Sequence, residues 1–351
     1  MERFRFESTA EAAKLPPQFN RALRKSFALT NPMALVADVG GTNVRFAMAD
    51  LEGQSVPHFD TFSAARFRSL PEAAAAYVKK TGAKPKVAAF AVAGPVTGDK
   101  ATITNLRWSM TTRELCEATG AEKTLLVNDF EAQALSVPLL AGDDLQQIGG
   151  DAPVDRAVKA VVGPGTGLGV GGIVWSSSRW MPIPGEGGHA TFAVETAEEL
   201  AILDRLREGL DHFSNERVLS GPGIINLYAA FAAHRGVKAQ MLEASEVTRR
   251  GLYKEDSIAV EALEFFVKAL GRVAGDTALT LGAQGGVYLG GGIPPKIQDA
   301  LAGPAFRRAF EQKGRLTPFL KPIPVFVILA RDAGLRGTAV ALAAAIKEGR
   351  V

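Results

Sequence analysis

The stretch TLLVNDFEAQAL (124–135) places an aspartate, Asp129, directly after an apolar run and at the start of a helix-like pattern. A carboxylate held at such a point can take a proton from a substrate hydroxyl, which is general base catalysis. The pattern also favours a structural role, because Asn128 followed by Glu131 is a variant of the capping box that satisfies free N–H groups at a helix start. The two roles are compatible if Asn128 and Glu131 cap the helix while Asp129 faces a ligand.

Four glycine-rich segments each follow an apolar run, and they lie at 35–43, 161–172, 183–190 and 287–294. Glycine allows positive φ and close approach of the backbone to a ligand, and successive N–H groups in such turns can bind anions. In the first segment apolar residues flank the glycines, which predicts a strand, a turn and a returning strand. The alternative is a plain Gly-Gly hairpin without a ligand. The groups that this segment offers to a phosphate and its cation belong to Asp38, Gly40, Gly41, Thr42 and Asn43.

The second segment contains a match to the dinucleotide-binding pattern G-x-G-x-x-G at 167–172, with Glu186 about 20 residues further along. That fold requires a helix directly after the glycines. The residues that follow, IVWSSSRWMPIPGEG, are rich in β-branched and aromatic types and include two prolines, so they predict strands instead. The P-loop pattern, G-x-x-x-x-G-K-S/T, does not occur. The stretch GPGTGLG therefore predicts a second hairpin turn that faces phosphates, at Gly165, Thr166 and Gly167.

The elements that must position these residues belong to a chain with the composition of a folded globular protein. Its 351 residues, 47% hydrophobic and 22% charged, suit one large domain or two ordinary ones. The sequence contains no uninterrupted run of about 18 apolar residues, so a membrane-spanning helix is not expected. With 40 basic and 37 acidic side chains and no basic block, nucleic-acid binding is not expected. The single cysteine, Cys116, excludes an internal disulfide and a zinc site of several thiolates, and it fits a reducing, cytoplasmic setting.

Taken in order along the chain, these segments resemble the bacterial glucokinase family, within the superfamily of hexokinase, actin and the heat-shock chaperone ATPases. The matching segments cover roughly residues 33–346 and read ADVGGTN, FAVAGPV, ITNLRWSM, LVNDFEAQA, GPGTGLG, PGEGGHA, ERVLSGPGI, GGVYLGGGI and DAGLRGTAVAL. The resemblance implies an α/β fold of the two-domain actin-like ATPase (ribonuclease H-like) type, with mixed sheets flanking a central cleft. We expect an N-terminal extension at 1–32, a small α/β domain at 33–139 plus 330–351, and a large α/β domain at 140–329.

The resemblance also implies an activity and a site. The activity is transfer of the γ-phosphoryl group of ATP to the 6-hydroxyl of glucose, with Asp129 as the general base. Asp38 would help to hold Mg²⁺, and the turn at Gly290, Gly291 and Gly292 would let the adenosine lie close to the backbone. The residues expected to bind the sugar are Asn105, Asn128, Asp129, Glu186, His189 and Glu216.

Several alternatives stay open from the sequence. A kinase for another hexose, such as fructose, mannose or an N-acetylated hexosamine, would use the same aspartate, and polyphosphate could replace ATP as the donor. An actin-like or chaperone-like ATPase would use the glycine turns but needs no sugar-binding carboxylates, and a sugar sensor would not need both Asp129 and Asp38. Glu216 can simply stabilise a helix N-terminus, and His189 can be an ordinary loop histidine. The expected partners are glucose and ATP, without nucleic acid or membrane, and the family suggests a homodimer.

Overall fold

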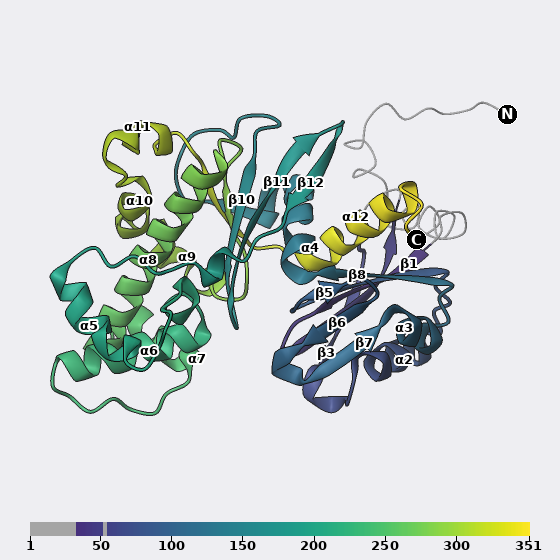
Figure 1. Cartoon of the computed structure of the whole chain (residues 1–351), viewed down its shortest axis with the longest axis horizontal. Coiled ribbons are helices and arrows are strands. Elements are labelled where there is room, and N and C mark those ends of the chain that lie inside the picture. Colours follow the sequence, from purple (N-terminus) through teal and green to yellow (C-terminus); the bar gives the residue numbers. More distant parts are fainter. Residues whose placement is uncertain (1–32, 52–54) are drawn as a thin grey trace, which may run out of the picture.

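The computed structural model describes residues 33–51 and 55–351, and the predicted N-terminal extension (1–32) lies outside them. The described chain forms two α/β halves that lie side by side, with helix α4 (Asp129–Ser136) and helix α12 (Ala333–Lys347) between them (Figure 1). Each half is built around a sheet with both parallel and antiparallel pairs. The predicted α/β fold with mixed sheets is confirmed.

The first half is built around a sheet whose described strands are β1 (Met33–Val39), β2 (Asn43–Asp50), β3 (Phe59–Ser63), β4 (Val87–Val92) and β8 (Lys123–Asn128). Their order in space is β3-β2-β1-β4-β8. Strand β1 pairs antiparallel with β2 and parallel with β4, and β4 pairs parallel with β8. The strand, turn and returning strand predicted around the first glycine pair are therefore confirmed.

The second half is built around a sheet whose described strands are β9 (Leu145–Gln147), β10 (Lys159–Pro164), β11 (Leu168–Ser176), β12 (Arg179–Ile183), β13 (Val287–Leu289) and β14 (Val325–Ile328). Their order is β12-β11-β10-β13-β14-β9. Strand β10 pairs antiparallel with β11 and parallel with β13. After the second glycine segment the chain continues as β11 and returns as β12, so the strands predicted in place of a dinucleotide-binding helix are confirmed.

A small sheet and the outer helices complete the described fold. Strands β5 (Val96–Thr97), β6 (Lys100–Ile103) and β7 (Trp108–Thr111) form an antiparallel sheet in the first half, where α2 (Leu70–Thr81) and α3 (Thr112–Thr119) also lie. The second half carries α5 (Ala197–Arg207), α6 (Gly221–His234), α7 (Ala244–Leu252), α8 (Ser257–Leu281), α9 (Gln298–Ala302), α10 (Pro304–Glu311) and α11 (Thr317–Leu320). Among the helices of the described ranges, none has both the length and the apolar character needed to cross a bilayer.

Both faces of each sheet are buried, because successive side chains of a strand point to opposite sides. Val162 of β10 packs in the cluster that contains α8, whereas its neighbour Val161 packs in the cluster that contains α4. In the first sheet, Leu35 of β1 packs with residues of α2 and α3, whereas Val36 packs with Leu335 of α12. Helices α4 and α12 contact each other and thus form one layer between the two sheets.

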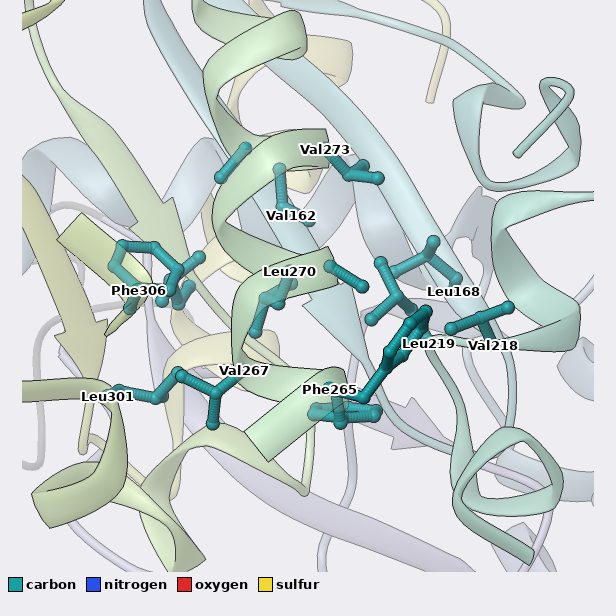
Figure 2. Packing of buried hydrophobic residues seen from close by; sticks show 14 of the residues in the cluster. Val162, Leu168, Val218, Leu219, Phe265, Val267, Leu270, Val273, Leu301 and Phe306 are labelled. Carbon is teal, nitrogen blue, oxygen red and sulfur yellow. The ribbon is translucent and has the colours of Figure 1, made fainter. Parts of the chain in front are cut away.

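The largest apolar cluster of the described chain surrounds α8 (Figure 2). Leu270 of α8 lies near the middle of this view, with Phe306 of α10 to its left. Gly271 lets α10 approach closely, because a Cβ atom at this position would lie 2.5 Å from the carbonyl oxygen of Phe306. Each fully buried aliphatic or aromatic side chain of this kind stabilises the fold by about 1.5–3 kcal/mol.

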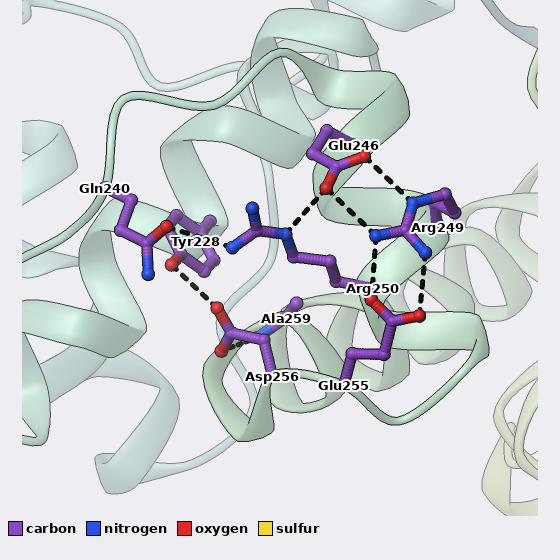
Figure 3. Close-up of polar contacts among 8 residues, drawn as sticks. All are labelled: Tyr228, Gln240, Glu246, Arg249, Arg250, Glu255, Asp256 and Ala259. Carbon is purple, nitrogen blue, oxygen red and sulfur yellow. Dashed lines mark hydrogen bonds and ion pairs between the residues drawn. The ribbon is translucent and has the colours of Figure 1, made fainter.

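A polar network connects α6, α7 and α8 on the surface of the second half (Figure 3). Arg249 of α7 pairs with Glu246 at 2.9 Å and with Glu255 at 2.7 Å. Asp256 caps α8 and accepts a hydrogen bond of 2.9 Å from the hydroxyl of Tyr228 in α6. Exposed ion pairs contribute only about 0–1 kcal/mol each, so the network orients the helices while the apolar cluster supplies most of the stability.

Candidate active site

The predicted site residues lie where parallel strands end. Strands β1, β4 and β8 run parallel in the first sheet, and β10, β13 and β14 run parallel in the second. Asp38 and Asn128 lie at the carboxyl ends of β1 and β8, and the turns that begin at Gly165 and Gly290 follow β10 and β13. Ligands of open α/β sheets bind outside the carboxyl ends of the strands, so these ends define the candidate active site.

Asn128 caps the helix that begins with Asp129. Its Oδ1 accepts hydrogen bonds from the backbone N–H groups of Phe130 at 2.9 Å and Glu131 at 3.2 Å, and its Nδ2 donates to the carbonyl of Gly94 at 3.2 Å. The predicted strand, cap and helix start are confirmed. The return bond expected from the Glu131 side chain is not formed among the described residues. That side chain is half-buried instead, and burial raises the pKa of its carboxyl.

Asp129 is a half-buried carboxyl at the first position of α4. Burial raises its pKa to about 7, and the carboxylates of Asp38 and Glu186 add to the rise, while the backbone N–H groups of Phe130 and of Asp129 itself oppose it. Asp129 therefore feels the charge of two other carboxylates, which come from two separate elements of the chain. A carboxyl whose pKa lies near neutral pH is well suited to act as a general base.

Asp38 is held between strand β2 and the start of α12. It is the cross-strand partner of Arg45, and its Oδ2 forms an ion pair of 2.7 Å with Nη1 of that arginine. On the other side, a Cβ atom at Gly334 would lie 2.8 Å from the Cγ of Asp38. Glycine at this first turn of α12 therefore makes room for the carboxylate.

The turn between β1 and β2 is closed by a hydrogen bond of 3.0 Å from the N–H of Gly40 to the carbonyl of Asn43. Neither Gly40 nor Gly41 has left-handed φ, and a Cβ atom at either position would make only ordinary van der Waals contacts. Thr42 is exposed at the tip. Asn105, predicted to bind the sugar, lies beside this turn, since a Cβ atom on Gly41 would be 3.8 Å from its Nδ2.

The turn between β10 and β11 lies against the turn that follows β13. The N–H of Gly165 donates to the carbonyl of Gly167 at 2.8 Å, which leaves Thr166 exposed at the tip. A Cβ atom on Gly165 would lie 3.8 Å from the nitrogen of Gly292. Gly291 has φ of 78°, a conformation that favours glycine. The structure therefore brings two of the three predicted nucleotide-binding turns together.

The two segments predicted to bind the sugar, EGGH and ERVLSGPG, also lie side by side. The side-chain Nδ2 of Asn215, the residue directly before the second segment, donates to the carbonyl of Gly187 in the first segment at 3.3 Å. Glu186 and His189, both in the first segment, have exposed side chains. Glu186 forms an isolated bridge with Val170 of β11, and β11 contacts α4, so the EGGH segment lies on the strand that packs against α4.

Glu216 belongs to the 3₁₀ turn η7 (Asn215–Arg217), and its side chain is hydrogen-bonded to the end of the β10–β11 turn. Its Oε2 accepts a hydrogen bond of 2.8 Å from the backbone N–H of Leu168. A Cβ atom on Gly167 would lie 2.4 Å from the same oxygen. A residue predicted to bind the sugar thus contacts a turn predicted to bind phosphates.

Several residues that build the site were not predicted from the sequence. The pairing of Arg45 with Asp38 could have been found, because a hairpin centred between Gly41 and Thr42 makes these two residues cross-strand partners. Other contacts join residues far apart in the chain and leave no local signal. One example is Gln133, whose Nε2 would lie 2.4 Å from a Cβ atom on Gly290. The full set is Arg45, Phe130, Gln133 and Gly334.

Known proteins are similar to this chain over most of its length. A family model described as Glucokinase matches residues 35–345. The glucokinase of Aromatoleum aromaticum is 44% identical over 310 residues, which are 88% of this chain and 94% of that protein. The glucokinase of Tolumonas auensis is 41% identical over 304 residues, 87% of this chain and 95% of that protein. A crystal structure of glucokinase from an Antarctic psychrotroph superposes with a TM-score of 0.77 at 34% identity, covering 89% of this chain and 98% of the other.

The resemblance predicted from nine short segments is thus confirmed over most of the described chain. The match includes every segment in which a site residue was predicted, from Asp38 to Gly292. The chain belongs to the glucokinase family.

Proposed function

We propose that this protein transfers the γ-phosphoryl group of ATP to the 6-hydroxyl of glucose. The observation that carries the proposal is the half-buried carboxyl of Asp129, whose pKa is raised to about 7 where the carboxyl ends of the strands meet. The identities of 41% and 44% to proteins named glucokinase support it. The same identities disfavour an actin-like or chaperone-like ATPase that acts on no sugar.

In the proposed reaction, Asp129 accepts the proton of the 6-hydroxyl while the hydroxyl oxygen forms its bond to the γ-phosphorus. The bond between that phosphorus and the oxygen bridging to the β-phosphate breaks, and ADP leaves with the electron pair. A carboxyl whose pKa is near 7 is largely ionised above neutral pH and is still basic enough to take the proton. The remaining rate enhancement comes from positioning and from charge stabilisation, as in other phosphoryl transfers.

The sugar would be held by side chains that match the donor and acceptor capacity of its hydroxyls. Glu186 and Glu216 can accept hydrogen bonds from hydroxyl groups. Asn128 uses its Oδ1 in the helix cap, so its amide NH₂ is the part that can donate to the sugar. His189, exposed in the EGGH segment, can donate or accept, and Asn105 would contact the substrate from the side of the β1–β2 turn.

The phosphates and Mg²⁺ would be held by Asp38 together with backbone N–H groups of the three turns. Among the described residues, no three side chains of metal-binding type come together. Mg²⁺ in phosphoryl-transfer sites is commonly held by one or two carboxylates plus substrate phosphates, so Asp38 at the end of β1 fits this requirement. When bound, the ion would neutralise charge on the phosphates. The turn residues proposed to contact the nucleotide are Gly40, Gly41, Thr42, Asn43, Gly165, Thr166, Gly167, Gly290, Gly291 and Gly292.

A coupled assay of ADP release over a panel of hexoses tests this function. We expect rapid release with glucose and ATP, dependence on Mg²⁺, and glucose 6-phosphate as the product identified by ³¹P NMR. Little ATP should be hydrolysed without sugar. A preference for fructose, mannose or an N-acetylated hexosamine would reassign the substrate, activity with polyphosphate in place of ATP would reassign the donor, and fast hydrolysis without sugar would overturn the kinase proposal.

We extend the proposal to the organisation of the protein. A division into a small domain (33–139 plus 330–351) and a large domain (140–329) is supported by the chain path, which leaves the first sheet after α4 and returns to it as α12. The family resemblance supports a homodimer, and the single cysteine supports a cytoplasmic location. Sedimentation velocity tests the dimer, and cell fractionation tests the location.

A further inference from the structure

The aromatic ring of Phe130, the residue after Asp129, lies against glycines of the β10–β11 hairpin. A Cβ atom at Gly163 would lie 2.5 Å from Cε2 of the ring, and one at Gly169 would lie 2.2 Å from Cδ2. At Gly171 the corresponding distance, to Cδ1, is 3.6 Å. Any side chain at Gly163 or Gly169 would therefore displace the ring.

The ring explains the glycines at 163 and 169, and backbone conformation does not. None of Gly163, Gly169 and Gly171 has left-handed φ. Glycine inside a strand weakens it and marks a place where another group approaches closely. Gly163 and Gly169 are direct cross-strand partners, so together they form a flat seat on one face of the hairpin for the ring of Phe130.

The same hairpin carries the turn predicted to bind phosphates. Gly163 lies two residues before Gly165, and Gly169 lies two residues after Gly167. The residue adjacent to Asp129 is therefore seated on the two strands that lead directly into and out of this turn. Strand β10 is paired with β11 from Lys159 to Pro164, which restricts its backbone. A displacement of Gly163 or Gly169 should therefore also displace the turn between the two strands.

The opposite side of α4 is also in close backbone contact. A Cβ atom at Gly337 of α12 would lie 1.6 Å from the carbonyl oxygen of Ala132. Helix α4 is thus held between α12 on one side and the glycine seat on the other. Asp129 is the first residue of the helix that these two contacts hold.

We propose that Phe130 is a positioning residue, whose ring, seated on Gly163 and Gly169, fixes the distance between the Asp129 carboxylate and the β10–β11 turn. The inference rests on the proposed function, in which that distance separates the general base from the transferred phosphoryl group. Reacting groups misplaced by about 1 Å can lose on the order of 100-fold in rate. Phe130 would contribute to turnover without contacting either substrate.

The first test compares Phe130→Ala and Phe130→Leu with a matched control, Phe326→Leu. Phe326 lies in the same apolar cluster and stacks on Tyr288 with ring centroids 5.0 Å apart, but it is remote from Asp129 in the chain. We expect kcat of both Phe130 variants to fall at least about tenfold while KM for glucose and ATP changes less than about threefold. Phe326→Leu should lose similar thermal stability and keep kcat. Equal kcat in the wild type and the Phe130 variants would overturn the proposal.

A double-mutant cycle isolates the contact itself. Gly169→Ala places a methyl group where the ring lies, so it should lower kcat about tenfold when Phe130 is present. In the Phe130→Ala or Phe130→Leu background the ring no longer fills that space, so Gly169→Ala should change kcat by less than about twofold. If Gly169→Ala lowers kcat by the same factor in both backgrounds, the glycine serves the turn and not the ring, and the proposal is wrong.

The wild-type assay separates failure of this inference from failure of the proposed function. A wild-type protein that phosphorylates no hexose would refute the function, and the cycle would then be measured on the midpoint of urea unfolding. Coupling between positions 130 and 169 in that midpoint reports the seat without any catalytic readout. A wild-type protein that phosphorylates glucose, combined with an additive cycle, would refute the positioning role alone.

Discussion

The carboxylate of Glu216 accepts a hydrogen bond of 2.8 Å from the backbone N–H of Leu168. Leu168 is the first residue of β11 and directly follows the turn proposed to bind phosphates. A side chain proposed to bind the sugar therefore also holds the nucleotide side of the site. This hydrogen bond connects the proposed glucose site to the proposed ATP site through the carboxylate of Glu216.

This link predicts different outcomes for two substitutions of Glu216. Glu216→Gln keeps an oxygen that can accept from Leu168, so KM for glucose should rise while KM for ATP stays near the wild-type value. Glu216→Ala removes the acceptor as well, and KM for ATP should rise about two- to tenfold, the range expected for one hydrogen bond. Steady-state kinetics with both substrates varied provides the measurement. As a control, Glu186→Ala should raise KM for glucose and leave KM for ATP unchanged. If KM for ATP is also unchanged in Glu216→Ala, the hydrogen bond to Leu168 does not link the two substrates.

Removing the carboxylate of Asp129 should abolish most of the turnover. We expect Asp129→Asn to lower kcat at least about 100-fold, since general base catalysis is commonly worth about 10²–10⁴ in rate. Glucose affinity, measured by titration calorimetry, should change much less, because the amide can still hydrogen-bond a hydroxyl. Asp143→Asn, at an exposed acid outside the site, is the control. Unchanged turnover in Asp129→Asn would remove this residue from the mechanism.

The raised pKa of Asp129, about 7, also predicts how stability depends on pH. Between the ordinary aspartate range and pH 7 the folded protein binds more protons at this site than the unfolded chain does, so the site's contribution to stability is lost as pH rises through 7. Asp129→Asn carries no charge and should be more stable than the wild type at pH 8 by roughly 1–3 kcal/mol, since one pKa unit corresponds to about 1.4 kcal/mol. Urea unfolding of both proteins at pH 5 and pH 8 provides the measurement. An advantage for the variant that is as large at pH 5 as at pH 8 would contradict the expected titration.

Gly334 should be needed for the proposed use of Mg²⁺. In Gly334→Ala the added Cβ would lie 2.8 Å from the Cγ of Asp38 and 2.9 Å from its Oδ2, so the carboxylate must move. We expect the Mg²⁺ concentration for half-maximal activity to rise about tenfold. Alanine favours helices over glycine by about 1 kcal/mol, so thermal stability should not fall. An unchanged Mg²⁺ requirement would separate Asp38 from the metal.

The parts of the site that follow from local pattern could be predicted from the sequence. The hairpin at Gly40 and Gly41, the strand ending at Asn128 and the helix beginning at Asp129 each depend on residues within a few positions of one another. The roles of Glu186, His189 and Glu216 came from the family resemblance, and they stay predictions. Asn105 also stays a prediction, although its place beside Gly41 groups it with the phosphate turn.

The contacts that align the two halves could not be predicted in this way. The glycines at 163 and 169 were interpreted as part of a phosphate-binding segment, yet the close neighbour of both is the ring of Phe130. A glycine in the sequence can indicate that another group approaches the backbone closely. It does not identify that group, which comes from a distant segment of the chain and is seen only in the folded structure. Gly334 beside Asp38 and Gly290 beside Gln133 have the same explanation.

The position of α12 has a consequence for how the protein is made. Strands β1 to β8 leave the ribosome long before α12, which supplies Leu335, Ala339 and Leu342 to one face of their sheet. About 200 residues separate the end of β8 from the start of α12, which at ~5–20 residues per second corresponds to roughly 10–40 s of synthesis. During that interval α4 can cover only part of this face, through Ala132 and Leu135. We therefore expect the nascent chain to be prone to aggregation until α12 emerges.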